Sequence, residues 1–147
     1  EKEIEESKTI VDCSGSYDME AYPSQIRQLF SNLINNSIKF KQEKVPPVIK
    51  ITCLDADHNA YPDLPLAKNK QYIKITVEDN GIGFDEEFSE RIFKIFQRLH
   101  GKAEYQGSGI GLAICKKIVD NHHGIIFANS TPGKGSSFTI LLPKTQF

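Results

Sequence analysis

Apolar residues recur along this chain with two different spacings, and each spacing predicts one kind of element. Between residues 22 and 41 they fall three and four positions apart, which is the spacing of one buried stripe along a helix. The stripe consists of Ile26, Leu29, Phe30, Leu33, Ile34 and Ile38. The same spacing predicts a second amphipathic helix over residues 110–120, and residues 86–99 are partly helical in pattern.

Short alternating or continuous apolar runs predict strands at residues 9–13, 48–54, 72–77, 125–128 and 137–142. Residues 55–70 are polar, contain two prolines and lack periodicity, which indicates a loop. The stretch "TPGKGSS" predicts a hairpin loop between the last two strands. Together these elements predict an α/β fold of two layers: a mixed sheet of about five strands with about three helices on one face.

Length and composition narrow the class of protein. The chain has 147 residues, 39% hydrophobic and 25% charged, which suits a single domain over residues 1–147 with a core at about 9–143. A net charge of -1 gives no basic field for nucleic acid or an anionic membrane. The three cysteines are far apart and lack a CxxC pair, which argues against a disulfide framework or a zinc site. No apolar run approaches a membrane span, and because the sequence opens without Met we expect a fragment of a longer protein.

The first predicted helix carries a second pattern beside its apolar stripe. Asn32, Asn36 and Lys39 are spaced four and three apart, so they line up on one side of the helix. Asparagine is unfavourable inside helices because its side chain competes for backbone hydrogen bonds. A solvated face explains the pattern, but an amide oxygen is also a hard ligand for Mg²⁺ and a lysine neutralises phosphate. Both interpretations stay open on these residues alone.

Two glycine-bearing stretches are candidates for ligand contact. In "VEDNGIGF", Asn-Gly is typical of a turn, yet the Asp79 carboxylate can accept a hydrogen bond from an exocyclic amine such as that of adenine. Gly81 and Gly83 would let the base approach the backbone. In "GSGIGLAICKKIV" three glycines at every second position lead into the second helix, whose N-terminal N–H groups can bind an anion. The βαβ context of a dinucleotide-binding turn and the lysine of a P-loop are both missing, so a phosphate loop of another kind is required.

Taken in order, these stretches resemble the nucleotide-binding boxes of one superfamily. It contains sensor histidine kinases, DNA gyrase, the heat-shock ATPase chaperones and the mismatch-repair ATPases. The matches are "NLINNSIKF" (N box), "DNGIGF" (G1 box), "IFKIFQRLH" (F box) and "GSGIGLAICKKIV" (G2 box), and the tail "HGIIFANSTPGKGSSFTILLP" resembles the ending of histidine kinases. The resemblance covers about residues 24–143 and implies a Bergerat-type ATP-binding fold, the catalytic ATP-binding domain of a sensor histidine kinase.

The resemblance implies a role for each matching residue. Asn36 would hold Mg²⁺, with Asn32 one turn earlier supporting the phosphates or the metal. Asp79 would read adenine, with Gly81 and Gly83 allowing close approach. The remaining positions are Lys39 at the phosphates, Phe40 near the base, Arg98 as a lid residue reaching the phosphates, Gly107, Ser108, Gly109, Gly111 and Leu112 at the lid end and phosphate turn, and Thr139 completing the adenine site through a water. Phe40 and Leu112 have an alternative role as core or lid anchors, and Arg98 as a surface charge.

The chain departs from the family pattern at Asn32. The ATP-hydrolysing relatives have a glutamate there to activate water, and an amide cannot accept that proton. A site that binds Mg-ATP without a base for water suits transfer of the γ-phosphate to a strong external nucleophile such as imidazole, so Asn32, Lys39 and Arg98 are the expected catalytic residues.

The second departure is that no phosphoacceptor helix precedes the N box. The expected partners are therefore a separate dimerisation and phosphoacceptor domain of the parent kinase and, downstream, a response-regulator receiver domain. Nucleic acid and direct membrane contact are not expected. The expected location is cytoplasmic, whether the parent is soluble or membrane-attached.

Three alternative functions stay open. The first is an anti-sigma-factor-like serine kinase, and the second is a non-catalytic nucleotide-binding module. The third, an ATP-driven clamp like gyrase or a chaperone, is disfavoured by Asn32 and by the small size.

Overall fold

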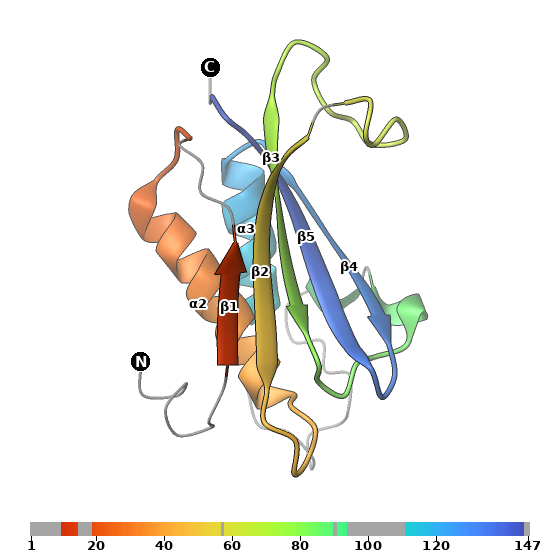
Figure 1. The fold of residues 1–147 in the computed structure, drawn as a ribbon. Helices are drawn as coiled ribbons and strands as arrows, with labels where there is room; N and C mark the ends of the chain where they lie inside the picture. The colour runs from red at the N-terminus through yellow and green to blue at the C-terminus, as the bar shows by residue number, and fades with distance from the viewer. Residues whose placement is uncertain (1–9, 15–18, 57, 90, 94–110, 146–147) are drawn as a thin grey trace.

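The strands form one five-stranded sheet in the order β1-β2-β3-β5-β4 (Figure 1). The computed structural model describes residues 10–14, 19–56, 58–89, 91–93 and 111–145. The strands are β1 (Ile10–Ser14), β2 (Val48–Ala56), β3 (Tyr72–Asp79), β4 (Ile125–Thr131) and β5 (Gly135–Pro143). β1 pairs with β2 in parallel and the other three pairs are antiparallel, so the predicted mixed sheet is confirmed.

Two helices, α2 (Pro23–Lys39) and α3 (Gly111–Asn121), cover the same face of this sheet (Figure 1). Proline is favoured at the first turn of a helix, where its missing N–H is not needed, and α2 starts in this way. Residues 86–99 were expected to be partly helical. Their described part forms two single 3₁₀ turns, η1 (Glu86–Phe88) and η2 (Arg91–Phe93), and residues 94–99 lie outside the described residues.

The core lies between the helices and the sheet. Alternate residues of β3 point towards the helices, and Ile73, Ile75 and Val77 are at most 4% exposed. Leu29 and Leu33 of α2 are fully buried against them. Burial of one such side chain contributes about 1.5–3 kcal/mol, so the predicted apolar stripes are the main attachment of the helices to the sheet.

A buried histidine joins the two helices at one end. His122 follows α3 and is 0% exposed. Its Nε2 accepts a hydrogen bond of 3.0 Å from the backbone N–H of Tyr22, directly before α2, and its Nδ1 lies 2.8 Å from the carbonyl oxygen of Ile118. The ring also packs edge-on against Tyr22, with 5.3 Å between ring centroids. This contact fixes the start of α2 relative to the end of α3.

The loop between β2 and β3 covers one end of the opposite face of the sheet. Leu66, Tyr72 and Leu141 form a second, smaller buried cluster there. The Tyr72 hydroxyl accepts a hydrogen bond of 2.9 Å from the backbone N–H of Ala67. The loop predicted between β2 and β3 is therefore packed onto the sheet. No helix among the described residues is long and apolar enough to cross a membrane.

The β4–β5 hairpin closes against the end of β3. Thr131 pairs with Gly135 across the turn, which confirms the predicted hairpin. Gly135 has φ +128°, a conformation that L side chains rarely adopt, and its Cα faces the backbone carbonyl of Asp79. A side chain at this position would push the hairpin away from β3.

We expect Gly135→Ala to lower the free energy of unfolding by about 3 kcal/mol or more, because the new Cβ meets the Asp79 carbonyl in a strained backbone conformation. Gly133→Ala is a matched control: its φ is also positive, at +80°, but nothing lies within 4 Å of its added Cβ. The control should cost about 1 kcal/mol. Urea denaturation measures both, and equal losses would show that contact with β3 does not matter.

Candidate functional site

The Asp79 carboxylate, at the end of β3, is held by donors from three segments. Its Oδ1 accepts hydrogen bonds from the backbone N–H of Gly81 at 2.9 Å and of Ser136 at 3.2 Å. Its Oδ2 accepts one from the Ser37 hydroxyl on α2 at 2.9 Å. Burial raises the pKa of Asp79 above its ordinary value, and the bonds from Gly81, Ser37 and Ser136 oppose this. The carboxylate is thus a half-buried, oriented acceptor where helix, strand end and hairpin meet.

The glycines after Asp79 let the turn pack against the chain's own backbone. A Cβ at Gly81 would meet the carbonyl oxygen of Phe40. Gly83 has φ +71°, and a Cβ there would collide with the carbonyl of Thr131. Both glycines are therefore required by close backbone contacts within the chain itself. Close approach of a base to them stays a prediction.

Two amide side chains fasten this turn to its surroundings. Nε2 of Gln42 lies 3.0, 3.1 and 3.0 Å from the carbonyl oxygens of Asn80, Gly81 and Gly133. The Asn80 side chain accepts from the backbone N–H of Val48 at 2.8 Å and donates to the carbonyl of Pro46 at 3.3 Å. These hydrogen bonds therefore connect the segment after α2, the turn and the β4–β5 hairpin.

Backbone hydrogen bonds also connect the turn after Asp79 to the residue after α2 and to the β4–β5 hairpin. The N–H of Ile82 donates to the carbonyl of Phe40 at 3.0 Å, and the N–H of Gly133 donates to the carbonyl of Ile82 at 2.7 Å. Phe40 itself is half-buried and contributes its carbonyl directly after α2. The structure shows this contact for Phe40, and its predicted position near a base is not tested.

The asparagines of α2 differ in their surroundings. Asn36 is half-buried, and Asn35 and Lys39 are exposed. Asn32 lies between the helices, beside the thiol of Cys115 on α3. Burial raises the pKa of Cys115 to about 12, and the neighbouring Asn32 amide opposes the rise. Nδ2 of Asn32 is buried and has no well-oriented hydrogen-bond partner among the described residues.

Two further predicted site residues, Gly111 and Leu112, lie at the start of α3. A Cβ on Gly111 would find nothing within 4 Å, so the backbone there is open. Leu112 packs against the main core, which is the alternative role considered for it. Arg98, Gly107, Ser108 and Gly109 lie outside the described residues, and their roles stay predictions.

The register of β3 and β5 corrects the expectation for Thr139. Thr139 pairs with Thr76, whereas Asp79 pairs with Ser136. Paired residues share a face of the sheet and successive residues alternate between faces, so Thr139 points to the face opposite Asp79. The structure does not bring Thr139 to the site. Ser136 is the β5 residue beside Asp79.

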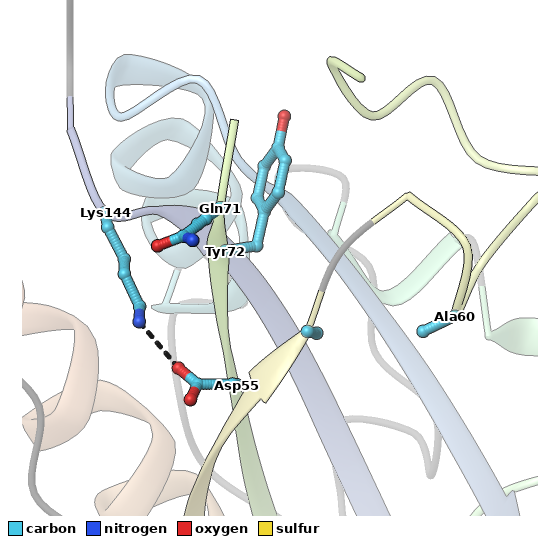
Figure 2. A pocket seen from close by; sticks show the side chains of 6 residues that line it. Asp55, Ala60, Gln71, Tyr72 and Lys144 are labelled. Carbon is cyan, nitrogen blue, oxygen red and sulfur yellow. Dashed lines mark ion pairs between the residues drawn. The ribbon is translucent and has the colours of Figure 1, made fainter. Parts of the chain in front are cut away.

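A cavity of about 330 Å³ lies at the other end of the sheet (Figure 2). It is lined by Asp55, Ala56, Ala60, Gln71, Tyr72 and Lys144, and Figure 2 shows the ion pair of 2.7 Å between Lys144 and Asp55. Tyr72 begins β3 and Asp79 ends it, which separates the cavity from Asp79 by about 23 Å. The cavity is therefore not part of this site.

Comparison with known proteins decides the family. Residues 21–146 match the family described as histidine kinase-, DNA gyrase B-, and HSP90-like ATPase. The chain belongs to this family. Phytochrome-like protein Cph1 of Synechocystis sp. is 44% identical over 140 residues, which are 95% of this chain and 17% of that protein. The chain thus spans less than a fifth of this curated relative.

Solved structures of the histidine-kinase branch of this family share the fold. The catalytic domain of histidine kinase ThkA, in a nucleotide-free form, is 27% identical, with a TM-score of 0.72 over 99% of this chain and 85% of that one. Full-length ShkA in complex with AMPPNP has a TM-score of 0.73 over 97% of this chain and 27% of that one. At 21% identity the likeness to ShkA shows the fold alone. The resemblance drawn from the four boxes is confirmed: this is a histidine-kinase-type ATP-binding catalytic domain.

Three residues that hold Asp79 and the turn after it were missed from the sequence: Ser37, Gln42 and Ser136. Ser37 does carry a signal, since it is a serine in the interior of an amphipathic helix on the apolar side. Gln42 and Ser136 carry none, because a polar residue after a helix or in a hairpin is ordinary. Their roles depend on partners 38 to 91 residues away.

We expect Gln42→Ala to loosen the turn, because three carbonyl groups lose their shared donor. The free energy of unfolding should fall by about 1 kcal/mol. Hydrogen exchange at the amides of Ile82 and Gly133 should become about tenfold faster. Gln28→Ala, at an exposed glutamine of α2, is the control and should change neither quantity. Unchanged hydrogen exchange in Gln42→Ala would contradict the role of Gln42 in holding the turn.

Proposed function

We propose that this domain binds Mg-ATP and transfers the γ-phosphate to a histidine on a separate dimerisation and phosphoacceptor domain of a sensor kinase. The observation that carries the proposal is the Asp79 carboxylate, fixed between α2, the turn and β5. Phosphate would then pass to a response-regulator receiver domain. The family membership supports nucleotide binding, and the ShkA neighbour was solved with AMPPNP.

The carboxylate has room for one more donor. An ionised carboxylate offers about four acceptor positions. Among the described residues three are filled, two on Oδ1 and one on Oδ2. The exocyclic amine of adenine is a donor that fits the fourth. Asp79 would in this way recognise the base.

The residues of α2 fit the metal and the phosphates. The Asn36 amide is half-buried on the same helix as Ser37, whose hydroxyl contacts the Asp79 carboxylate. Mg²⁺ takes oxygen ligands, so the Asn36 amide oxygen would hold the ion, and the ion would supply charge that neutralises the phosphates. Lys39 is exposed at the end of the helix and can reach phosphate, and Asn32 would support the phosphates or the metal, as the resemblance implies. Arg98, Gly107, Ser108 and Gly109 would cover the phosphates, as the resemblance implies.

The chemistry at Asn32 favours transfer over hydrolysis. An amide does not accept a proton at neutral pH, so Asn32 cannot activate water as a carboxylate would. An imidazole is a stronger nucleophile than water, and any base that it needs to attack phosphorus can lie on its own domain. The nucleophile would therefore be brought by the partner domain, while this domain positions the nucleotide.

Asn36→Ala should abolish Mg²⁺-dependent strengthening of ATP binding, because the proposed metal ligand is lost. Asn35→Ala is the matched control, since Asn35 is the neighbouring asparagine on the exposed side of α2. Calorimetric titration of ATP with and without Mg²⁺ measures both variants. An equal loss in the two would contradict the assignment of the metal to Asn36.

The domain alone should hydrolyse ATP very slowly, because a positioned general base contributes about 10²–10⁴-fold and Asn32 provides none. Labelled phosphate should appear only on an added dimerisation fragment that carries an acceptor histidine, and it should be acid-labile. Acid-stable phosphate would instead indicate a serine kinase. Rapid turnover by the isolated domain would contradict the kinase proposal.

A further inference from the structure

Ser37 is a buried polar residue that the proposed function does not yet use. It is 2% exposed, in the interior of α2 and on the side facing the sheet. A serine inside a helix often bonds back to its own helix. Here its hydroxyl instead donates across to Oδ2 of Asp79 at 2.9 Å, between positions 42 residues apart. The contact connects the metal-side helix directly to the base-reading carboxylate.

The pattern of donors around Asp79 gives Ser37 a particular role. Both hydrogen bonds to Oδ1 come from backbone N–H groups, those of Gly81 and Ser136. The described side chains contribute one donor to Oδ2, the Ser37 hydroxyl. By filling one of the two acceptor positions on that oxygen, Ser37 determines which position is left for a ligand.

Ser37 also acts on the protonation of Asp79. Burial raises the pKa of Asp79, and Ser37 is the side-chain donor that lowers it. The facing residues on the paired strands are Ile49 and Ser136, and neither is charged. Glu78 is exposed and points to the opposite face of the sheet, and Lys39 is exposed on α2. A protonated carboxyl would donate a hydrogen bond instead of accepting one.

We propose that Ser37 is a positioning residue that sets base specificity. Its hydroxyl orients the Asp79 carboxylate as an acceptor, which favours binding of a purine with a 6-amino group over one with a 6-oxo group. The inference rests on the proposed binding of ATP. A 6-amino purine donates to the free position on Oδ2. A 6-oxo purine presents an acceptor to an acceptor and is repelled.

The test compares three nucleotides that differ only at position 6 of the base: ATP, inosine triphosphate and purine riboside triphosphate. Their affinities for the 147-residue chain are measured by calorimetry with Mg²⁺ in excess, for the wild type, Ser37→Ala and the control Ser31→Ala. Ser31 is an exposed serine on the same helix. All three ligands share sugar and phosphates, so the ratio of two affinities does not depend on how much of a variant is folded.

We expect Ser37→Ala to weaken ATP binding about tenfold and to change binding of the other two nucleotides less than twofold. The ratio of the affinity for ATP to the affinity for inosine triphosphate should therefore fall about tenfold in Ser37→Ala. In Ser31→Ala this ratio should stay at the wild-type value. The carboxylate form binds ATP, and loss of Ser37 raises the pKa of Asp79. The loss of ATP affinity on acidification should accordingly begin at higher pH in Ser37→Ala.

Ser37→Cys provides a second variant if Ser37→Ala does not fold. A thiol is a weaker donor of similar size, so its ratio should lie between those of the wild type and a variant without any donor. A wild type that binds none of the nucleotides would overturn the proposed function itself. A wild type that prefers ATP, with the same ratio and the same pH dependence in the Ser37 variants, would overturn this inference alone.

Discussion

The attachment of Asp79 and its turn to the rest of the chain is the constraint on which the site depends. A half-buried carboxylate needs hydrogen-bond donors from the protein, because an unpaired buried charge is strongly unfavourable. The donors come from α2, from the turn itself and from the β4–β5 hairpin. Satisfying one carboxylate therefore brings together segments that are separated by up to 57 residues in the sequence.

Packing of α2 against the sheet makes those hydrogen bonds possible. Leu29 and Leu33 fix the rotation of α2 by burying one stripe against the sheet. With that stripe inward, Ser37 points to the sheet and Asn35 to solvent, since positions four apart share a face and positions two apart do not. His122 fixes the opposite end of the same helix through the N–H of Tyr22. The position of the N box thus follows from the core and not from the ligand.

Holding Asp79 in place has an energetic consequence for the free domain. Burial raises its pKa, so the folded state binds a proton there more readily than the unfolded chain does. The contribution of Asp79 to stability is present at acid pH and is lost as the pH rises through its folded-state pKa. At neutral pH the domain therefore keeps a carboxylate that disfavours folding, and a bound amine donor would offset this cost. Residues retained against stability in this way are typical of binding sites.

The sequence by itself determined the elements and the family. Apolar spacing is a local property, and it located the five strands and the two long helices to within a few residues of their observed bounds. The four boxes are also local strings, so their order alone revealed an ATP-binding domain of the histidine-kinase type. Tertiary structure decided which residues surround Asp79. Strand register placed Ser136 beside it and turned Thr139 to the opposite face, because a shift of one residue exchanges the two faces of a strand. It also assigned Ser37 and Gln42 their roles, since a hydrogen bond between positions 42 or 91 residues apart leaves no local pattern in the chain.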